Sequence, residues 1–490
     1  MKWRCCVVGS VVLSAVATYG FANRVAAAAP QVFWASDPVR AGETVLLQGS
    51  DFGTAAMVEI VRLADGLPRE PSAAKEALGW TRVPVLQAGD DSLKFALAAD
   101  VSMGVFACRV TAQGATSSPV LLNAPDPWWL QGNGGPAVTP GGWLRVLGKS
   151  LDFGRGSLVR LAPQQGTAVV LKPPAGDGYS LGVVLPEDLK PGNYTVAVHN
   201  GLGGSAAWRE AGTLQAKVAH PWPSDVFNVL DFYGPEAAAA MRKTLNKYSP
   251  VPDRTEGIRA ALKKAQANGG GVVYFPAGRY GICGDLAIPP RTMLRGEGTG
   301  LAVLWWGTGR FNLDGGSDEG LDDAKARREV PGTLMHGTEF GLENMSLYLP
   351  LDFRTAISGG ERLSLRRVRV RVDHLWALDG RKRPEGLVAR LGNHAEVTDC
   401  DILAKGEGLV PGRYCLIARN RVMAGKTNCP LGGAQQAIVE DNQFVSLYPT
   451  AYQNIAGSGR NLYYARNRHE ALQVHQADYS FTFDAGGGPS

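Results

Sequence analysis

Short phrases of six residues recur along the second half of the chain, with mostly apolar residues at their first and last positions. The copies begin at Leu342, Leu365, Val397, Ile417, Val439 and Tyr464. The starts at 342, 365, 397, 417, 439 and 464 are separated by 23, 32, 20, 22 and 25 residues, a spacing typical of solenoids whose repeats stack to bury their apolar sides. No helical pattern lies between the phrases, so the sequence predicts a parallel β-helix.

Stacking the six copies sorts their residues into columns. The fourth position should point inward at a bend, and its last three members predict a ladder of paired side-chain amides: Asn420, Asn442 and Asn467. The third and fifth positions should point outward, and their charges alternate mainly between arginine and aspartate. Because neighbouring strands lie about 4.8 Å apart, we expect ion pairs along both outward columns.

A single helix is predicted just before the solenoid. Its apolar stripe has three- and four-residue spacing and consists of Ile258, Ala261, Leu262 and Ala265. Asp253 and Thr255 can accept hydrogen bonds from N–H groups at the helix start. The glycines at 269–271 can end the helix, and a strand at 272–275 follows. We expect this helix to cover the N-terminal end of the solenoid core.

The region before the helix contains one strand-and-turn unit twice. The run Val45–Gly53 matches Leu144–Gly154, and Gly104–Val110 matches Gly192–Val198. Short alternating strands separated by glycine turns, in units of about 100 residues, favour antiparallel sandwiches. We place the two sandwiches at residues 30–124 and 125–217.

The helix and its flanking phrases resemble the entry segment of the pectate-lyase-like superfamily. The matching residues are Phe227–Phe232, Gly269–Gly271, Phe275-Pro276, Gly278, Tyr280, Leu294, Gly296 and Gly298. The resemblance implies an all-β chain with a right-handed parallel β-helix over residues 218–490, capped by the N-terminal helix. The two preceding sandwiches are similar to IPT/TIG-type immunoglobulin-like domains. The superfamily includes lyases, hydrolases, epimerases and non-enzymes, so the fold does not define the reaction.

The first 29 residues have the pattern of a secretory signal. Lys2 and Arg4 precede an apolar run at 7–17, and alanines at 26–29 form a cleavage region. A retained membrane anchor is the alternative, and no later stretch is apolar for the roughly 18 residues that a span needs. We therefore expect a secreted, periplasmic or cell-surface protein.

The charge and the cysteines narrow the function classes. A net charge of +5 over 490 residues, with no nucleic-acid module, argues against nucleic acid as a partner. Five cysteines follow the signal, with no C-x-x-C spacing, so neither a disulfide framework nor a zinc site is indicated. We expect buried thiols, with a Cys415–Cys429 bridge as the alternative.

An arginine cluster is the predicted substrate-binding surface. Arg367, Arg369 and Arg371 alternate with valines, so all three should share one exposed strand face. Guanidinium forks bind carboxylates in two-point contact, and Arg369 could stabilise charge during a reaction. The remaining residues predicted to bind substrate are His374, Lys382 and Arg383.

Two further groups are candidates for chemistry. His469, Glu470 and Asp484 lie near the glycine-rich tail and could act as acid and base, with an ordinary connecting loop as the alternative. Asp399, Asp401 and Asp441 could hold Ca²⁺. Their arginine neighbours favour a solvated ladder of ion pairs instead, and we expect no other cofactor.

Together these features predict a secreted carbohydrate-active protein that acts on an extended, acidic polysaccharide. We expect a polysaccharide lyase, which needs a base and a cation for the charge that develops. A glycoside hydrolase of the β-helix type and a non-catalytic glycan-binding or adhesion protein are the alternatives. The chain ends soon after the sixth copy with no evident cap, so we expect the β-helix to be truncated there. The particular sugar and the oligomeric state are left open.

Overall fold

The computed structural model describes residues 29–66, 79–242, 251, 253–306, 332–349, 353–372, 386–404, 406–425, 427–447, 455–456 and 459–471. Residues 1–28 of the predicted signal lie outside this set. The chain forms two compact units. The first comprises Met1–Ala124 with Leu202–Ala207, and the second comprises Pro125–Gly201 with Trp208–Ser490.

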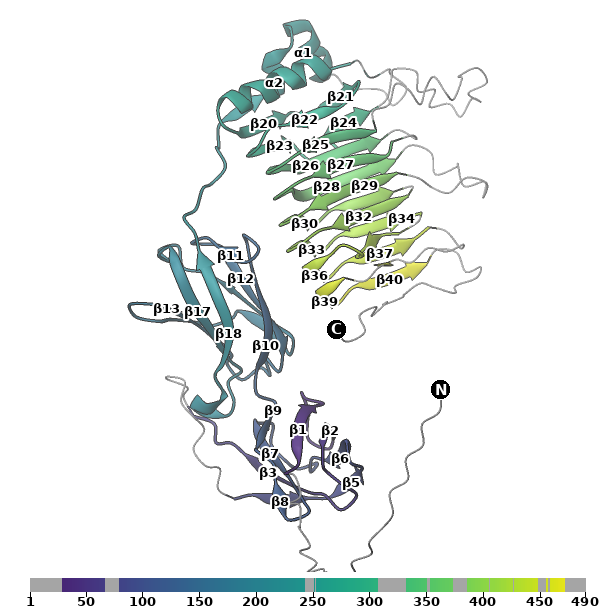
Figure 1. Cartoon of the computed structure of the whole chain (residues 1–490). Helices are drawn as coiled ribbons and strands as arrows, with labels where there is room; N and C mark the ends of the chain where they lie inside the picture. The colour runs from purple at the N-terminus through teal and green to yellow at the C-terminus, as the bar shows by residue number, and fades with distance from the viewer. Residues whose placement is uncertain are drawn as a thin grey trace, which may run out of the picture. The chain divides into compact units, whose positions relative to one another are not determined.

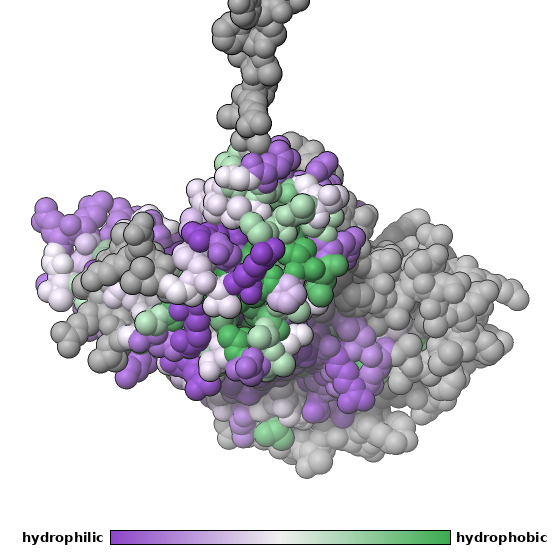
Figure 2. Space-filling view, turned by 90° about the horizontal axis from the view of Figure 1, so that it is seen from below, coloured by the Kyte–Doolittle hydropathy of each residue, from purple (hydrophilic) through white to green (hydrophobic). Residues whose placement is uncertain are grey.

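The first unit contains two antiparallel sheets. The first sheet has the strand order β1 (Gln31–Ala35), β2 (Thr44–Ser50), β6 (Ser92–Ala96), β5 (Val85–Ala88). The second sheet has the order β4 (Thr81–Val83), β3 (Met57–Arg62), β7 (Phe106–Ala112), β8 (Ala115–Thr116), and β9 (Val120–Leu122) also pairs with β7. Leu47 and Phe95 of one sheet share a core with Val58 and Phe106 of the other. Phe33 is one of the large hydrophobic residues that are exposed. Figure 2 shows a face of the molecule on which hydrophobic residues gather.

The second unit begins with another two-sheet sandwich. One sheet has the strand order β10 (Asp126–Gly132), β12 (Trp143–Lys149), β16 (Ser180–Val184), β15 (Ala175–Asp177). The other has the order β11 (Ala137–Val138), β18 (Arg209–Ala216), β17 (Gly192–His199), β13 (Leu158–Pro163), β14 (Val169–Leu171). Its pairs are antiparallel except β11 with β18, which is parallel. The resemblance of both sandwiches to IPT/TIG-type modules stays a prediction.

Most of the rest of the second unit is a stack of parallel strands in three ladders (Figure 1), with a separate parallel pair of β35 (Cys429–Pro430) and β38 (Ile455–Ala456). The first ladder has the order β19 (Val226–Asn228), β20 (Gly271–Phe275), β23 (Thr292–Gly296), β26 (Phe340–Leu349), β28 (Ser364–Val372), β30 (Glu396–Thr398), β33 (Leu416–Ala418), β36 (Gln435–Glu440), β39 (Arg460–Ala465). The second ladder consists of β21 (Gly278–Ile282), β24 (Ala302–Trp306), the later parts of β26 and β28, β31 (Asp401–Ala404), β34 (Arg421–Ala424), β37 (Gln443–Ser446), β40 (Arg468–Ala471). The third ladder consists of β22 (Leu286–Ile288), β25 (Thr333–Gly337), β27 (Thr355–Gly359), β29 (Leu387–Gly392), β32 (Glu407–Pro411). This all-β arrangement of a parallel β-helix after two sandwiches agrees with the predicted fold class.

One end of the stack is covered by helix α2 (Thr255–Ala267), next to α1 (Pro235–Arg242) (Figure 1). The predicted apolar stripe of α2 is buried in the core of the β-helix. At the helix start, Oδ1 of Asp253 accepts a hydrogen bond from the Thr255 amide at 2.9 Å. The Thr255 hydroxyl accepts instead from the Cys283 amide at 2.7 Å, so it links the helix to the strands.

A sharp corner separates the first ladder from the second. Every residue at the third position of the six-residue phrase has a positive φ between 51° and 58°, a left-handed conformation uncommon for residues other than glycine. Just after this corner, the Asn442 amide group donates to Oδ1 of Asn467 at 2.9 Å, and the Asn420 amide group donates to Oδ1 of Asn442 at 3.0 Å. The predicted asparagine ladder is confirmed.

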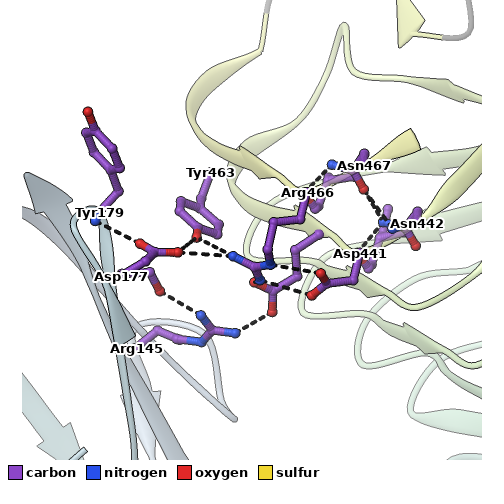
Figure 3. Close-up of polar contacts among 12 residues, drawn as sticks. Arg145, Asp177, Tyr179, Asp441, Asn442, Tyr463, Arg466 and Asn467 are labelled. Carbon is purple, nitrogen blue, oxygen red and sulfur yellow. Dashed lines mark hydrogen bonds and ion pairs between the residues drawn. The ribbon is translucent and has the colours of Figure 1, made fainter. Parts of the chain in front are cut away.

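The second sandwich packs against the first ladder within the second unit. Trp129 and Leu147 of the sandwich form an apolar cluster with Ile438 and Tyr463. Figure 3 shows the polar contacts beside this cluster. The Tyr463 hydroxyl donates to Asp177 at 2.7 Å, so the last coils and the sandwich share one interface.

All five cysteines after the predicted signal are free, and four of them are buried as expected, including Cys415 and Cys429, which form no bridge with each other. Cys283 is exposed, so the expectation of buried thiols was wrong for this residue. Burial raises the pKa of the Cys415 thiol to about 11, which makes both the thiolate and its oxidation unfavourable. Among the described residues, no helix has the length and apolar character needed to cross a membrane.

Candidate functional site

The third ladder carries an outward column that the sequence did not single out. Register places His336 of β25, Ser358 of β27 and Arg390 of β29 side by side on successive strands. Their neighbours Met335, Ile357 and Ala389 point the other way, into the core. We call His336, Ser358 and Arg390 the third-ladder column.

A carboxylate holds the histidine of this column in place. Nε2 of His336 lies 3.0 Å from Oδ2 of Asp285, and both side chains are about half exposed. The hydrogen bond with His336 lowers the pKa of the Asp285 carboxyl. Arg259 donates to the Asp285 carbonyl at 2.9 Å, which anchors the segment before β22.

The spacing of this column suits proton transfer beside a cation. Two strand separations of about 4.8 Å place Arg390 roughly 10 Å along the ladder from His336, with Ser358 between them. A histidine oriented by a carboxylate can act as a base. An exposed arginine can bind a carboxylate group of a ligand in fork geometry. The column therefore combines a base and an anion-binding group on one surface.

The sequence signal for this column was weak. His336, Ser358 and Arg390 precede the starts of the next phrases, at 342, 365 and 397, by six, seven and seven residues. Only this nearly constant offset places the three residues on one column. The third ladder has no recognisable phrase of its own, so the sequence alone does not distinguish His336 from the other scattered histidines.

The second ladder carries the predicted arginine cluster, centred on Asp401. Arg371 forms an ion pair with the Asp401 carboxylate and donates to the Asp401 carbonyl at 3.0 Å. Arg369 and Arg421 lie 3.7 Å and 3.8 Å from the same carboxylate. One acidic group thus serves three guanidinium groups, which leaves positive charge on this surface.

An aromatic pair lies next to these arginines. The rings of Trp305 and Tyr348 are stacked with centroids 3.9 Å apart, and Tyr348 is the register neighbour of Arg371. The Arg279 guanidinium lies 5.8 Å from the centroid of the Trp305 ring. Along the second ladder the aromatic pair therefore lies between the strands that carry Arg279 and Arg371.

Arg367 does not belong to the predicted common face. Its φ of 51° places it at the corner, where the two-residue alternation of a strand is interrupted. Its side chain donates to Oδ1 of Asn344 and to Oε1 of Glu343, both at 2.6 Å, away from Asp401. The prediction of three arginines on one face was wrong for this reason, while Arg369 and Arg371 do share a face.

The carboxylates considered for Ca²⁺ are engaged by arginines. Asp399 accepts from Arg419 at 2.9 Å with each oxygen, and Asp441 accepts from Arg466 at 2.8 Å and 2.9 Å. The arginine contacts lower the pKa of both carboxyl groups. Within the part of the chain that the structure describes, no group of three or more His, Cys, Asp or Glu could hold a metal ion. This arrangement does not support the calcium interpretation and agrees with a charge ladder.

The tail candidates do not come together as an acid–base pair. His469 points inward, where Nε2 lies 2.6 Å from the Tyr464 hydroxyl and the ring lies beside Phe444; burial lowers its pKa. Glu470 is on the opposite side of β40 and accepts from Arg468 at 2.6 Å. Consecutive strand residues face opposite ways, so an exposed His469–Glu470 pair is excluded. The other candidates, Asp484, His374, Lys382 and Arg383, lie outside the described residues.

Comparisons with known proteins give distant structural likenesses only. No protein-family model matches the chain, and no curated protein sequence matches it significantly. Similar solved structures include the A-module of a mannuronan C-5 epimerase from Azotobacter vinelandii, with 14% identity over 51% of this chain and 77% of that chain, TM-score 0.30. An exopolygalacturonase from Thermotoga maritima has 11% identity over 53% and 79%, TM-score 0.29. PfbA, a surface adhesin of Streptococcus pneumoniae, has 11% identity over 52% and 76%, TM-score 0.31. Likenesses of this extent carry no information on reaction or ligand.

Proposed function

We propose that the protein is a secreted polysaccharide lyase that cleaves an acidic polysaccharide at the third-ladder column. The observation that carries this proposal is the placement of His336, held by Asp285 at 3.0 Å, on the same outward column as Arg390. An eliminating enzyme needs a base and a cation within reach of one sugar residue. The column supplies both groups.

The chemistry assigns a role to each residue. In its neutral form His336 takes the proton from the carbon next to the uronate carboxylate. The electron pair forms a carbon–carbon double bond, and the bond to the glycosidic oxygen on the following carbon breaks. Arg390 binds the carboxylate and stabilises the charge that develops on it. The departing oxygen takes up a proton from water and leaves as a hydroxyl group. Ser358, between His336 and Arg390, can donate a hydrogen bond to this oxygen or to the sugar.

The second ladder would hold neighbouring sugar residues of the same polymer. Arg369, Arg371 and Arg421 surround a single carboxylate, Asp401, so this surface has guanidinium groups in excess. A polymer with a carboxylate on each residue would match such a row. Arg369 is here a substrate-binding group, because the carboxylate beside it, Asp401, is already engaged by Arg371.

The third-ladder column can be tested with an absorbance assay on uronate polymers. We expect the wild-type chain to raise the ultraviolet absorbance through the new double bond. His336→Gln and Arg390→Ala should each lower the rate at least about 100-fold, the usual contribution of a positioned base or charge-stabilising group. His220→Gln and Arg155→Ala, both exposed elsewhere, are matched controls that should keep the activity.

Other outcomes would point elsewhere. New reducing ends without absorbance would indicate a hydrolase. An unchanged elimination rate in His336→Gln would show that His336 is not the base. The second candidate is binding without catalysis, which the arginine excess around Asp401 favours; polymer binding with neither product would support it, provided that Arg421→Ala weakens the binding.

A further inference from the structure

A cavity lies between the second sandwich and the first ladder, within the second unit. Its volume is about 400 Å³, within the usual range for small-ligand pockets. The residues that give it its chemistry are Trp143 and Asn133 of the sandwich, Trp222 of the segment before β19, and Arg362, His394 and Glu396 of the β-helix.

Glu396 is the central polar group of this cavity. Its Oε1 accepts a hydrogen bond from the indole N–H of Trp143 at 3.2 Å. Burial raises the pKa of the Glu396 carboxyl above its ordinary value, as expected for an acid withdrawn from water. A carboxyl group in such a place can donate or accept hydrogen bonds, which suits sugar hydroxyl groups.

The other polar groups are held in fixed positions. Nδ1 of His394 lies 2.9 Å from Oε2 of Glu361, and its ring is stacked on Tyr414 with centroids 5.4 Å apart. Arg362 lies at the same type of left-handed corner, with φ 55°, and pairs with Glu339 at 3.5 Å. The cavity thus combines two indole rings with a carboxyl, an imidazole and a guanidinium group.

We propose that this cavity is a saccharide-binding site. A sugar ring would pack its apolar C–H face on Trp143 and Trp222, and its hydroxyl groups would bond to Glu396, His394 and Arg362. Indole rings combine a large apolar face with one polar N–H, and the surrounding donors and acceptors converge from two parts of the chain. A purely apolar ligand would shield these polar groups from water without bonding to their remaining donors and acceptors, which costs free energy.

A neighbouring cavity gives the bound sugar chain room to extend. This second cavity has a volume of about 560 Å³ and shares Trp143 and Val184 with the first. Arg145 and Arg466, drawn in Figure 3, also line it. A sugar chain that leaves the first cavity past Trp143 would therefore meet arginine side chains as well as apolar ones.

The site is separate from the third-ladder column and does not depend on the proposed elimination. Calorimetric titration of the full chain would test it, with His336→Gln in every sample so that no probe is cleaved. The probes are trigalacturonate, trimannuronate and the neutral cellotriose. We expect at least one probe to bind, and Trp222→Ala and Glu396→Gln each to weaken its affinity about tenfold, equivalent to one lost contact. Trp128→Ala, exposed on the same sandwich, should leave the affinity unchanged.

Three results would overturn the site. These are binding of none of the probes, equal affinity in Trp222→Ala and its parent, and loss of binding through Arg390→Ala alone. Circular dichroism of each variant separates loss of binding from loss of folding. An absent absorbance increase in the elimination assay would refute the proposed lyase activity and leave this site standing.

Discussion

Asn442 carries its hydrogen bonds inside the coil, where no water can replace them. It is 2% exposed, and its amide group donates to the Ile417 carbonyl and to Asn467, both at 2.9 Å. Its Oδ1 accepts a hydrogen bond from the backbone N–H of Asn420 at 2.9 Å. The asparagine of each coil therefore hydrogen-bonds to polar groups at the corner of the previous coil. Loss of one asparagine leaves groups of both neighbouring coils without a partner.

Replacement of Asn442 by alanine should destabilise the β-helix. The change leaves buried backbone and amide groups of two coils without partners, at a cost of about 2 to 4 kcal/mol. Urea unfolding followed by circular dichroism measures this free energy. Asn193→Ala, at an exposed strand position, should change it by less than about 0.5 kcal/mol. Equal effects of the two changes would show that the ladder adds no stability.

Glu396 should make the stability depend on pH in an unusual direction. Its pKa is raised above the ordinary 4.5 because burial penalises the charged form. The folded chain therefore holds this proton more tightly than the unfolded chain, so stability falls as the pH rises from 4.5 through the raised pKa. Glu396→Gln keeps an acceptor for Trp143 and should raise the free energy of unfolding at pH 7 relative to wild type.

This difference should shrink as the pH falls to 4.5. Denaturant unfolding at both pH values measures it, with Glu187→Gln, an exposed residue, as the control. A glutamine variant that is less stable than wild type at pH 7 would mean that attraction to Arg362 and Arg366 outweighs burial.

Among the strands and helices, glycines mark the places where coils approach most closely. A Cβ on Gly296, at the end of β23, would lie 2.5 Å from the Asn344 carbonyl oxygen and 2.8 Å from Cβ of Met345. Both atoms belong to the next coil and cannot move independently. Gly296 is therefore required by packing between coils rather than by an unusual φ.

Gly296→Ala should cost about 1 to 3 kcal/mol, as is usual for overpacking. Gly298→Ala is the matched control, because its nearest neighbour at 3.3 Å is the flexible end of the Leu301 side chain. Thermal unfolding of the two variants compares them directly. A larger loss in Gly298→Ala would contradict the close approach of the coils at Gly296.

Across the second unit, the sandwich and the last coils are joined by both apolar and charged contacts. Arg145 forms an ion pair with Glu440, whose side chain is only 6% exposed, and Arg466 bonds the same carboxylate at 2.8 Å. Asp177 of the sandwich accepts from Tyr463 at 2.7 Å and from Arg466 at 3.0 Å. The buried carboxylate of Glu440, which has two guanidinium partners, favours one fixed arrangement of the interface.

Asp177→Ala should weaken this interface by about 1 to 3 kcal/mol, because the largely buried Tyr463 hydroxyl and Arg466 lose an acceptor. In scanning calorimetry we expect the sandwich and the β-helix of the variant to unfold in separate transitions. Asp188→Ala, on an exposed turn of the same sandwich, should keep the wild-type profile. A profile of Asp177→Ala identical to wild type would show that the apolar contacts alone hold the interface.

The sequence alone determined the elements whose signals are local or repeat at a constant spacing. The coil phrases, the asparagine ladder and the apolar stripe of α2 could be predicted, because each depends on residues a few positions apart or on identical places in successive coils. The prediction of a common arginine face failed at Arg367, since an arginine by itself gives no signal for a left-handed corner.

The tertiary structure alone decided which chemical groups meet. His336 and Asp285 are 51 residues apart, and Trp143 and Glu396 are 253 residues apart, distances over which no periodicity links one residue to another. The length of each turn between ladders sets which side chains share a column, and the docking of the sandwich sets which of them line a cavity. Both depend on packing of the folded chain, which is why the candidate sites emerged only from the three-dimensional arrangement.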